Sequence, residues 1–263
     1  MDNGLILRTN DLSIHFGGLA AVNRVNVEVS AGRTVGLIGP NGSGKTTFFN
    51  LISGIYKPTE GDVWFRGENV VGHKPHHMTR KGMARTFQNN RLFWQLSILD
   101  NVILGMYTKQ RADLFDVLFR YKRVTKELGE CAEQAVEILS YFSPELAEHH
   151  LRLVSDLSQG DRRRVEICRA LASDPHLLLL DEPSAGMSPE ETDKLMDDIG
   201  KVRKKFRNIS IIIIEHDMDV IEKIAEHVYV FNYGKKIAEG LYSEIAKNEE
   251  VLEAYLGRET DDA

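Results

Sequence analysis

The sequence is poor in cysteine and contains no long apolar run. Its 263 residues include two cysteines, Cys131 and Cys168, which are far apart and lack the spacing of a metal site. A disulfide framework is therefore excluded, and a reducing compartment fits this composition. The longest aliphatic runs, residues 177–180 and 211–214, fall far short of the roughly 20 apolar residues that cross a bilayer. If the protein works at a membrane, it must dock onto a separate subunit.

Basic residues are not in excess either. The sequence has 33 lysines and arginines against 39 aspartates and glutamates, which gives a formal net charge of -6. Because nucleic-acid binders normally carry a basic patch or stripe, this balance argues against nucleic acid as a partner. The beginning of the chain has no basic stretch followed by an apolar one, so we expect no secretory signal peptide.

The order of apolar and polar residues predicts an α/β fold. Partial alternation over residues 5–16 and 22–29 predicts antiparallel strands with one buried face. After residue 172, short aliphatic segments alternate with helix-forming ones, which predicts a mainly parallel sheet covered on both faces, and a last helix over residues 242–256. We therefore expect one domain over residues 1–263, with an N-terminal antiparallel β layer and an inserted helical subdomain at roughly 90–172.

A glycine-rich segment carries the clearest motif. Residues 39–47 read GPNGSGKTT and fit the phosphate-loop pattern G-x-x-x-x-G-K-[ST] between an expected strand, residues 34–38, and an expected helix, residues 45–53. Glycines let backbone N–H groups turn toward phosphates, and the helix adds its positive N-terminal end. We expect Lys45 to reach the β- and γ-phosphates and Thr46 to bind Mg²⁺ in a P-loop NTPase core. The expected nucleotide-binding residues are Gly39, Pro40, Asn41, Gly42, Ser43, Gly44, Lys45, Thr46 and Thr47.

Two acids end a later aliphatic segment. Residues 177–182 read LLLLDE, so Asp181 and Glu182 are expected at the C-terminal end of a buried strand. Beside a phosphate loop, Asp181 can reach Mg²⁺ directly or through water. Glu182 can orient and deprotonate an attacking water. The alternative is a role for these acids in a turn or at a helix start.

Two more segments fit a phosphate site. Residues 211–217, IIIIEHD, predict a buried strand that brings His216 to the same sheet edge, where it can contact the γ-phosphate; a structural histidine is the alternative. Residues 157–161, LSQGD, precede a helix-forming run. There Ser158 and Gly160 offer a hydroxyl, backbone N–H groups and a helix dipole to an anion, although a serine N-cap is the simpler reading.

Together, and in this order over nearly the whole chain, these segments resemble the nucleotide-binding domain of ABC transporters. The correspondences are Walker A at 39–47, the Q-loop at Gln88, the signature at 157–161, Walker B at 177–182, the D-loop at 184–187 and the switch histidine at His216. The resemblance implies ATP and Mg²⁺ as ligands and an aromatic contact of Phe16 with adenine. It implies catalytic roles for Glu182, His216 and Gln88, and metal contacts for Thr46, Gln88 and Asp181.

Two departures from the family pattern concern the dimer contacts. The usual signature LSGGQ reads LSQGD here, and Met187 stands where the D-loop commonly has an aspartate. Asp161 brings a negative charge to an expected anion site. That charge is unfavourable unless Asp161 caps the helix or pairs with a following arginine, Arg162, Arg163 or Arg164.

The resemblance also implies partners. In this family two such domains meet head to tail with ATP between the phosphate loop of one and the signature of the other. It implies a second ATPase subunit, identical or paralogous, transmembrane permease subunits, and a cytoplasmic location at the inner face of the cell membrane. An apolar cluster, Leu92, Phe93 and Trp94, offers a docking surface for a permease helix, with core packing as the alternative.

Some stretches resemble the ATPases of branched-chain amino acid importers in particular, which would add a solute-binding protein as an indirect partner. They are residues 82–88, 91–93, 213–218 and 230–240. Related ATPases serve urea or short-amide importers and lipopolysaccharide exporters, which stay open. A soluble ABC ATPase acting on DNA or ribosomes is a further alternative, but such proteins usually carry a long coiled coil or two cassettes, and this sequence has neither.

Overall fold

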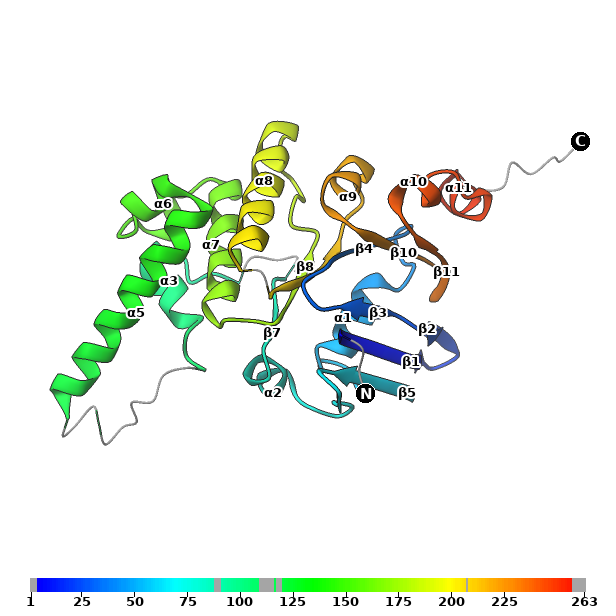
Figure 1. The fold of residues 1–263 in the computed structure, drawn as a ribbon, viewed down its shortest axis with the longest axis horizontal. Coiled ribbons are helices and arrows are strands. Elements are labelled where there is room, and N and C mark those ends of the chain that lie inside the picture. Colours follow the sequence, from blue (N-terminus) through cyan, green and yellow to red (C-terminus); the bar gives the residue numbers. More distant parts are fainter. Residues whose placement is uncertain (1–3, 88–90, 109–115, 117–119, 207, 257–263) are drawn as a thin grey trace, which may run out of the picture. The chain divides into compact units, whose positions relative to one another are not determined.

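The computed structural model describes residues 4–87, 91–108, 116, 120–206 and 208–256. The chain divides into two compact units (Figure 1). The first unit consists of Met1–Arg85, His176–Pro183 and Arg207–Ala263. The second unit consists of Thr86–Pro175 and Ser184–Phe206.

The first unit begins with an antiparallel sheet. Its strands are β1 (Leu5–Phe16), β2 (Leu19–Val25), β3 (Glu28–Ser30), β5 (Glu60–Phe65) and β6 (Glu68–Asn69). They follow the order β2-β1-β5-β6, and β3 also pairs with β1. Val25, Val27 and Val29 are buried while the residues between them are exposed, which is the alternation that predicted a sheet with one buried face.

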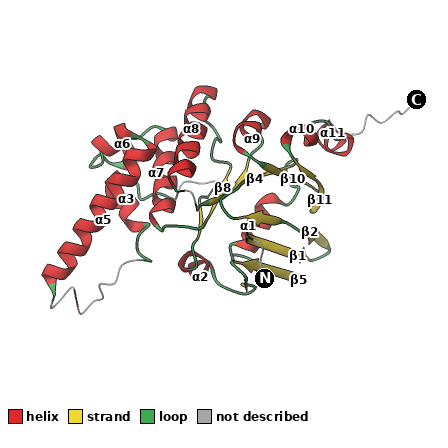
Figure 2. Cartoon of the chain, in the orientation of Figure 1, coloured by secondary structure: helices red, strands yellow, loops and turns green. Residues whose placement is uncertain are grey.

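The same unit contains a mainly parallel sheet with the order β11-β10-β4-β9-β8-β7 (Figure 2, where the strands of both sheets are yellow). Its strands are β4 (Thr34–Ile38), β7 (Met83–Arg85), β8 (Leu177–Asp181), β9 (Ser210–Ile214), β10 (His227–Asn232) and β11 (Lys235–Gly240). Neighbours from β10 to β7 run parallel, and β11 is antiparallel to β10. Every residue of β4, β8 and β9 is buried, as expected for strands covered on both faces.

Helices cover both faces of this sheet (Figure 1). They are α1 (Lys45–Ile52), α2 (Pro75–Arg80), α9 (Met218–Ile224), α10 (Tyr242–Ile245) and α11 (Glu249–Leu256). On one face Phe48 of α1 packs edge-on against Phe231 of β10, with ring centroids 5.3 Å apart. On the other face α9 lies so close to β4 that a Cβ on Gly36 would be 3.2 Å from Ile221. The core of this unit therefore joins α1 to both sheets.

The C-terminal helix predicted over residues 242–256 is wrong in one respect, because the structure has two helices there. Asn248 lies between α10 and α11, and its Oδ1 accepts a hydrogen bond from the N–H of Val251 at 3.2 Å. An asparagine side chain that satisfies the N–H groups of a following first turn starts a new helix at that point.

The second unit is helical. Its elements are α3 (Ile98–Leu104), α5 (Tyr121–Phe142), α6 (Pro144–Glu148), the 3₁₀ helix η1 (Val154–Asp156), α7 (Gln159–Ala172) and α8 (Pro189–Lys205). A buried ion pair joins α7 to α8, with Arg164 Nε 3.2 Å from Asp198 Oδ2. Among the described residues, none of the helices combines the length and the apolar character that a membrane-spanning segment needs. The predicted mixed fold, with an antiparallel layer, a mainly parallel sheet and a helical insertion, is confirmed.

Candidate functional site

The phosphate loop connects β4 to α1 in a conformation that requires glycine at both ends. Gly39 has φ 146° and Gly44 has φ 103°, values that L side chains rarely adopt. A Cβ on Gly39 would lie 2.1 Å from the carbonyl oxygen of Phe231, and one on Gly44 would lie 2.5 Å from that of Ala21. The loop is thus held against β10 and β2, with the N-terminus of α1 directed at its centre.

Lys45 folds back over this loop. Its Nζ donates to the carbonyl oxygens of Gly39 at 2.6 Å and Pro40 at 2.9 Å, and to Ser43 Oγ at 3.4 Å. Burial lowers the pKa of Lys45, while the carboxylates of Glu182 and Asp181 act to raise it. A buried ammonium group therefore lies at the loop, held by neutral oxygen acceptors.

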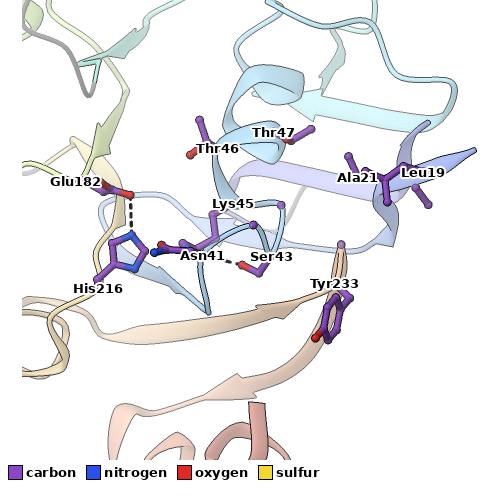
Figure 3. A pocket seen from close by; sticks show the side chains of 14 residues that line it. Leu19, Ala21, Asn41, Ser43, Lys45, Thr46, Thr47, Glu182, His216 and Tyr233 are labelled. Atoms are coloured by element: carbon purple, nitrogen blue, oxygen red, sulfur yellow. Dashed lines mark hydrogen bonds and ion pairs between the residues drawn. The ribbon is translucent and has the colours of Figure 1, made fainter. Parts of the chain in front are cut away.

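The two acids and the histidine lie at the carboxyl ends of β8 and β9. Asp181 is the last residue of β8, and the N–H of Glu182 donates to the carbonyl oxygen of Ile214, the last residue of β9, at 3.0 Å. Glu182 has φ 47°, a strained value for a residue other than glycine. Its Oε1 lies 2.7 Å from His216 Nε2, so the two side chains form a hydrogen-bonded pair (Figure 3).

A cavity of about 370 Å³ contains these groups. Figure 3 shows Lys45 and Asn41 near its centre, the Glu182–His216 pair at one end, and Leu19, Ala21 and Tyr233 at the other. The lining residues are Leu19, Ala20, Ala21, Asn41, Gly42, Ser43, Gly44, Lys45, Thr46, Thr47, Glu182, His216, Tyr233 and Gly234. One cavity therefore combines backbone donors, a cation, a carboxylate and an apolar end.

The structure brings most of the predicted first-unit residues to this cavity. The carbonyl oxygens of Gly39 and Pro40 accept hydrogen bonds from Lys45, and Asp181 is buried next to Glu182 in the chain. Phe16 is not among the lining residues; the residue is 48% exposed, and its ring lies edge-on to that of Tyr56, with centroids 5.5 Å apart. Gln88 lies outside the described residues.

Sequence reasoning missed the apolar end of the cavity. Tyr233 is 86% exposed and sits with Gly234 in the turn between β10 and β11. The turn became recognisable only with β11, a polar edge strand that hydrophobic patterning did not identify. The run Asn232-Tyr233-Gly234, with its asparagine and glycine, was the available signal for a hairpin.

Ser158 and Gly160 belong to the second unit, at the start of α7. Ser158 caps this helix, because its Oγ accepts from the N–H of Asp161 at 3.1 Å. The same hydroxyl donates to Asp161 Oδ2 at 2.9 Å. Asp161 Oδ1 pairs with Arg164 Nη1 at 3.2 Å, so its charge is compensated by one of the three arginines considered. Gln159 Nε2 donates to the carbonyl oxygen of Ala185 at 3.0 Å.

The apolar cluster in this unit divides between core and surface. Leu92 is buried, whereas Phe93 is 56% and Trp94 is 48% exposed. Arg162 lies over the Trp94 ring, with its Cζ 4.4 Å from the centroid, and its Nη2 donates to the carbonyl oxygen of Ser155 at 2.8 Å. Core packing therefore accounts for Leu92, and the two aromatic rings remain on the surface.

Two family models match the chain. One is described as ABC transporter and matches residues 22–185; the other is described as branched-chain amino acid ATP-binding cassette transporter and matches residues 235–261. The chain is similar to the high-affinity branched-chain amino acid transport ATP-binding protein LivG of Escherichia coli (strain K12). The two are 39% identical over 252 residues, which cover 96% of this chain and 98% of that protein.

Solved structures of ABC transporter cassettes are also similar to this chain. An ATP-binding cassette of an ABC transporter in its ADP conformation matches with a TM-score of 0.83 and 32% identity, over 96% of this chain and 99% of that one. A bacterial ABC transporter cassette solved as a dimer matches with a TM-score of 0.73 and 25% identity, over 90% of this chain and 98% of that one.

Proposed function

The chain belongs to the ABC transporter family of ATP-binding subunits, and from that premise we propose that it powers the import of branched-chain amino acids across a cell membrane. The observation that carries the choice of substrate is the match of residues 235–261, which include β11, α10 and α11, to the branched-chain amino acid model. Similarity to LivG over 96% of the chain supports the same choice. Import of urea or short amides and export of lipopolysaccharide are the alternatives.

ATP is proposed to bind with its phosphates against residues 39–47. The inward-turned loop, the N-terminus of α1 and the Lys45 ammonium all favour negative charge at this position. Its adenine ring is proposed to lie toward the apolar end of the cavity. Phe16 is one candidate for the contact with adenine, and Tyr233, which lines the cavity, is a second.

Hydrolysis is proposed to depend on Glu182, His216 and Gln88. Glu182 would orient and deprotonate the attacking water. His216 would contact the γ-phosphate. The distance of 2.7 Å between Glu182 Oε1 and His216 Nε2 supports a second role for this histidine, which is to hold the Glu182 carboxylate in place. No other described pair of an acid and a histidine lines the cavity, which makes this pair the best candidate for the chemistry.

Mg²⁺ is proposed to be held by the Thr46 hydroxyl, the Asp181 carboxylate and the Gln88 side chain. These are oxygen donors, the kind that this ion prefers. Asp181 and Glu182 supply adjacent carboxylates at the end of β8, and Thr46 lines the same cavity as Glu182, so the donor set fits. When bound, the ion neutralises charge on the phosphates.

We propose that both units form one nucleotide-binding domain, and that a second ATPase subunit, a copy of this chain or a paralogue, completes the site with its own Ser158 and Gly160. A similar cassette solved as a dimer supports this arrangement. The exposed Phe93 and Trp94 support docking of transmembrane permease subunits, with the chain at the cytoplasmic face of the membrane. A solute-binding protein would be an indirect partner.

Asp161 is expected to reduce activity, and Asp161→Gln should raise kcat/KM for ATP. Ser158 Oγ donates a hydrogen bond to Asp161 Oδ2 at 2.9 Å, so a phosphate at this site competes for that hydrogen bond and meets a negative charge. Removing the competing charge is worth about 1 kcal/mol, or roughly fivefold in rate, measured by phosphate release. Arg164 keeps its second partner, Asp198, in the variant.

Asp156→Asn is the matched control, because Asp156 is an exposed carboxylate near α7 that accepts a hydrogen bond from Ser155 Oγ at 3.0 Å. Its rate should equal that of the unmodified protein. A lower rate in Asp161→Gln would mean that Asp161 supports the signature rather than weakening it.

Uptake measurements test the proposed substrate. The gene for this chain is deleted in its source organism, and uptake of labelled leucine and labelled urea is measured at low micromolar concentration. We expect leucine uptake to fall and to return with the unmodified chain but not with a Lys45→Met chain. Loss of urea uptake instead would favour the alternative, and unchanged uptake of both would contradict the proposal.

A further inference from the structure

Arg85 is a nearly buried arginine that the proposed roles do not use. It ends β7, which pairs in parallel with β8, and its side chain is 7% exposed. A buried guanidinium group is unfavourable unless its N–H groups have acceptors. The acceptors that Arg85 contacts therefore indicate its role.

Those contacts connect α1, the helix that follows the phosphate loop, to Asp181. Arg85 Nη2 donates to Asp181 Oδ2 at 2.7 Å, and both side chains are buried. Arg85 Nη1 donates to Asn50 Oδ1 at 2.7 Å and to Ser53 Oγ at 3.2 Å. Asn50 lies in α1 and Ser53 caps its C-terminus. One guanidinium group therefore connects α1 to the carboxylate of Asp181.

The ring of Phe49, also in α1, lies next to the guanidinium group. Arg85 Cζ lies 5.3 Å from the centroid of this buried ring. Hydrogen bonds in two directions and a ring contact leave the group little freedom to turn. The planar fork of an arginine can make these bonds together, whereas the compact charge of a lysine cannot.

We propose that Arg85 is a positioning residue that fixes the Asp181 carboxylate relative to α1, the helix that carries Thr46. The inference rests on the proposed function, in which Thr46 and Asp181 share one Mg²⁺. Arg85 bonds to Oδ2, and a carboxylate has about four lone-pair sites, so this bond is compatible with a contact between Asp181 and the ion or its water. Arg85 would thereby set how well the site accepts Mg²⁺ with nucleotide.

A purely structural role for Arg85 makes a different prediction. If the ion pair served only to stabilise the fold, the variants would have lower thermal stability. The molecules that remain folded would then bind nucleotide with an unchanged dependence on Mg²⁺. A positioning role changes the Mg²⁺ dependence itself, because partners that orient metal ligands typically contribute about 10- to 100-fold to metal affinity.

The test compares Arg85→Met and Arg85→Lys with the unmodified chain. Binding of a fluorescent ATP analogue is measured without metal and across a Mg²⁺ titration, and the Mg²⁺ dependence of phosphate release is measured alongside. We expect metal-free affinity within about twofold, and a Mg²⁺ half-saturation raised about tenfold in Arg85→Met. Arg85→Lys keeps the charge but loses the fork, so a smaller increase, about threefold, is expected.

Arg33→Met is the matched control. Arg33 also pairs with a carboxylate of the first unit, that of Glu226, but its side chain is 62% exposed and it precedes β4, at the end opposite the phosphate loop. Its Mg²⁺ half-saturation should equal that of the unmodified chain.

Three results would overturn the inference. If both Arg85 variants fold and their Mg²⁺ half-saturation is unchanged, while the unmodified chain is normal, the positioning role is overturned and the proposed function is not. If Arg85→Met does not fold, an unchanged Arg85→Lys has the same meaning. Failure of the unmodified chain to bind or hydrolyse ATP with Mg²⁺ would overturn the proposed function as well, and the two failures are therefore distinguishable.

Discussion

Glu182→Gln is expected to lower the rate of ATP hydrolysis about 10²- to 10⁴-fold, the usual contribution of a general base. Glutamine keeps the size of the side chain and an oxygen that can stay near His216 Nε2, now 2.7 Å from Glu182 Oε1. It cannot take a proton from water. Because glutamine tolerates φ 47° no worse than glutamate, backbone strain at this position is unchanged and ATP binding should persist. Phosphate release at saturating ATP and Mg²⁺ measures the effect.

Glu190→Gln is the control for this prediction, since Glu190 is an exposed acid in the first turn of α8 and should leave the rate unchanged. Size-exclusion chromatography of Glu182→Gln then tests the shared site. A dimer with ATP that disappears with ADP supports a sandwich of two copies of this chain. A monomer that still binds ATP would favour a paralogue or the permease subunits as the missing partner, and a rate within a few-fold of normal would remove Glu182 from the role of base.

Family membership and much of the fold followed from local patterns, and the comparisons confirm the membership. β4, β8 and β9 were predictable because every residue in them is buried, so their aliphatic runs are unbroken. β7 is three residues long and β11 is a polar edge strand, so neither has a periodicity to detect. Sequence reasoning fails at such short or exposed elements because tertiary pairing, rather than composition, makes them strands.

The site shows the same division. Residues 39–47 could be predicted as a unit, because the glycines, the lysine and the threonine of this motif lie in one short continuous segment of the sequence. Arg85 and Asp181 are 96 positions apart and meet only because β7 lies beside β8, a neighbourhood that no local pattern predicts. Asp161 is an intermediate case. Its need for a cap or an arginine partner followed from charge, but the choice of Arg164 over its neighbours depended on α7.

Lys45→Met is expected to weaken ATP binding by about 3 kcal/mol, which is about a hundredfold in Kd. The buried ammonium group now has only neutral acceptors in the bonds described, the carbonyl oxygens of Gly39 and Pro40 and the hydroxyl of Ser43. Phosphate oxygens would replace weak acceptors with charged ones, and such bonds are about twice as strong. Methionine keeps the length of the side chain and removes the charge, so isothermal titration with ATP measures that difference.

Stability separates this effect from unfolding. Burial lowers the pKa of Lys45, which means that the charged form is disfavoured by its surroundings despite the nearby Glu182 and Asp181. Removing the ammonium group should therefore leave the Tm unchanged or higher, while Lys57→Met, at an exposed lysine of the same unit, should change neither Tm nor affinity. If Lys45→Met kept normal affinity, the backbone N–H groups of the loop and the dipole of α1 would have to hold the phosphates by themselves. The fixed glycine conformations at Gly39 and Gly44 would then be the main determinant of nucleotide binding.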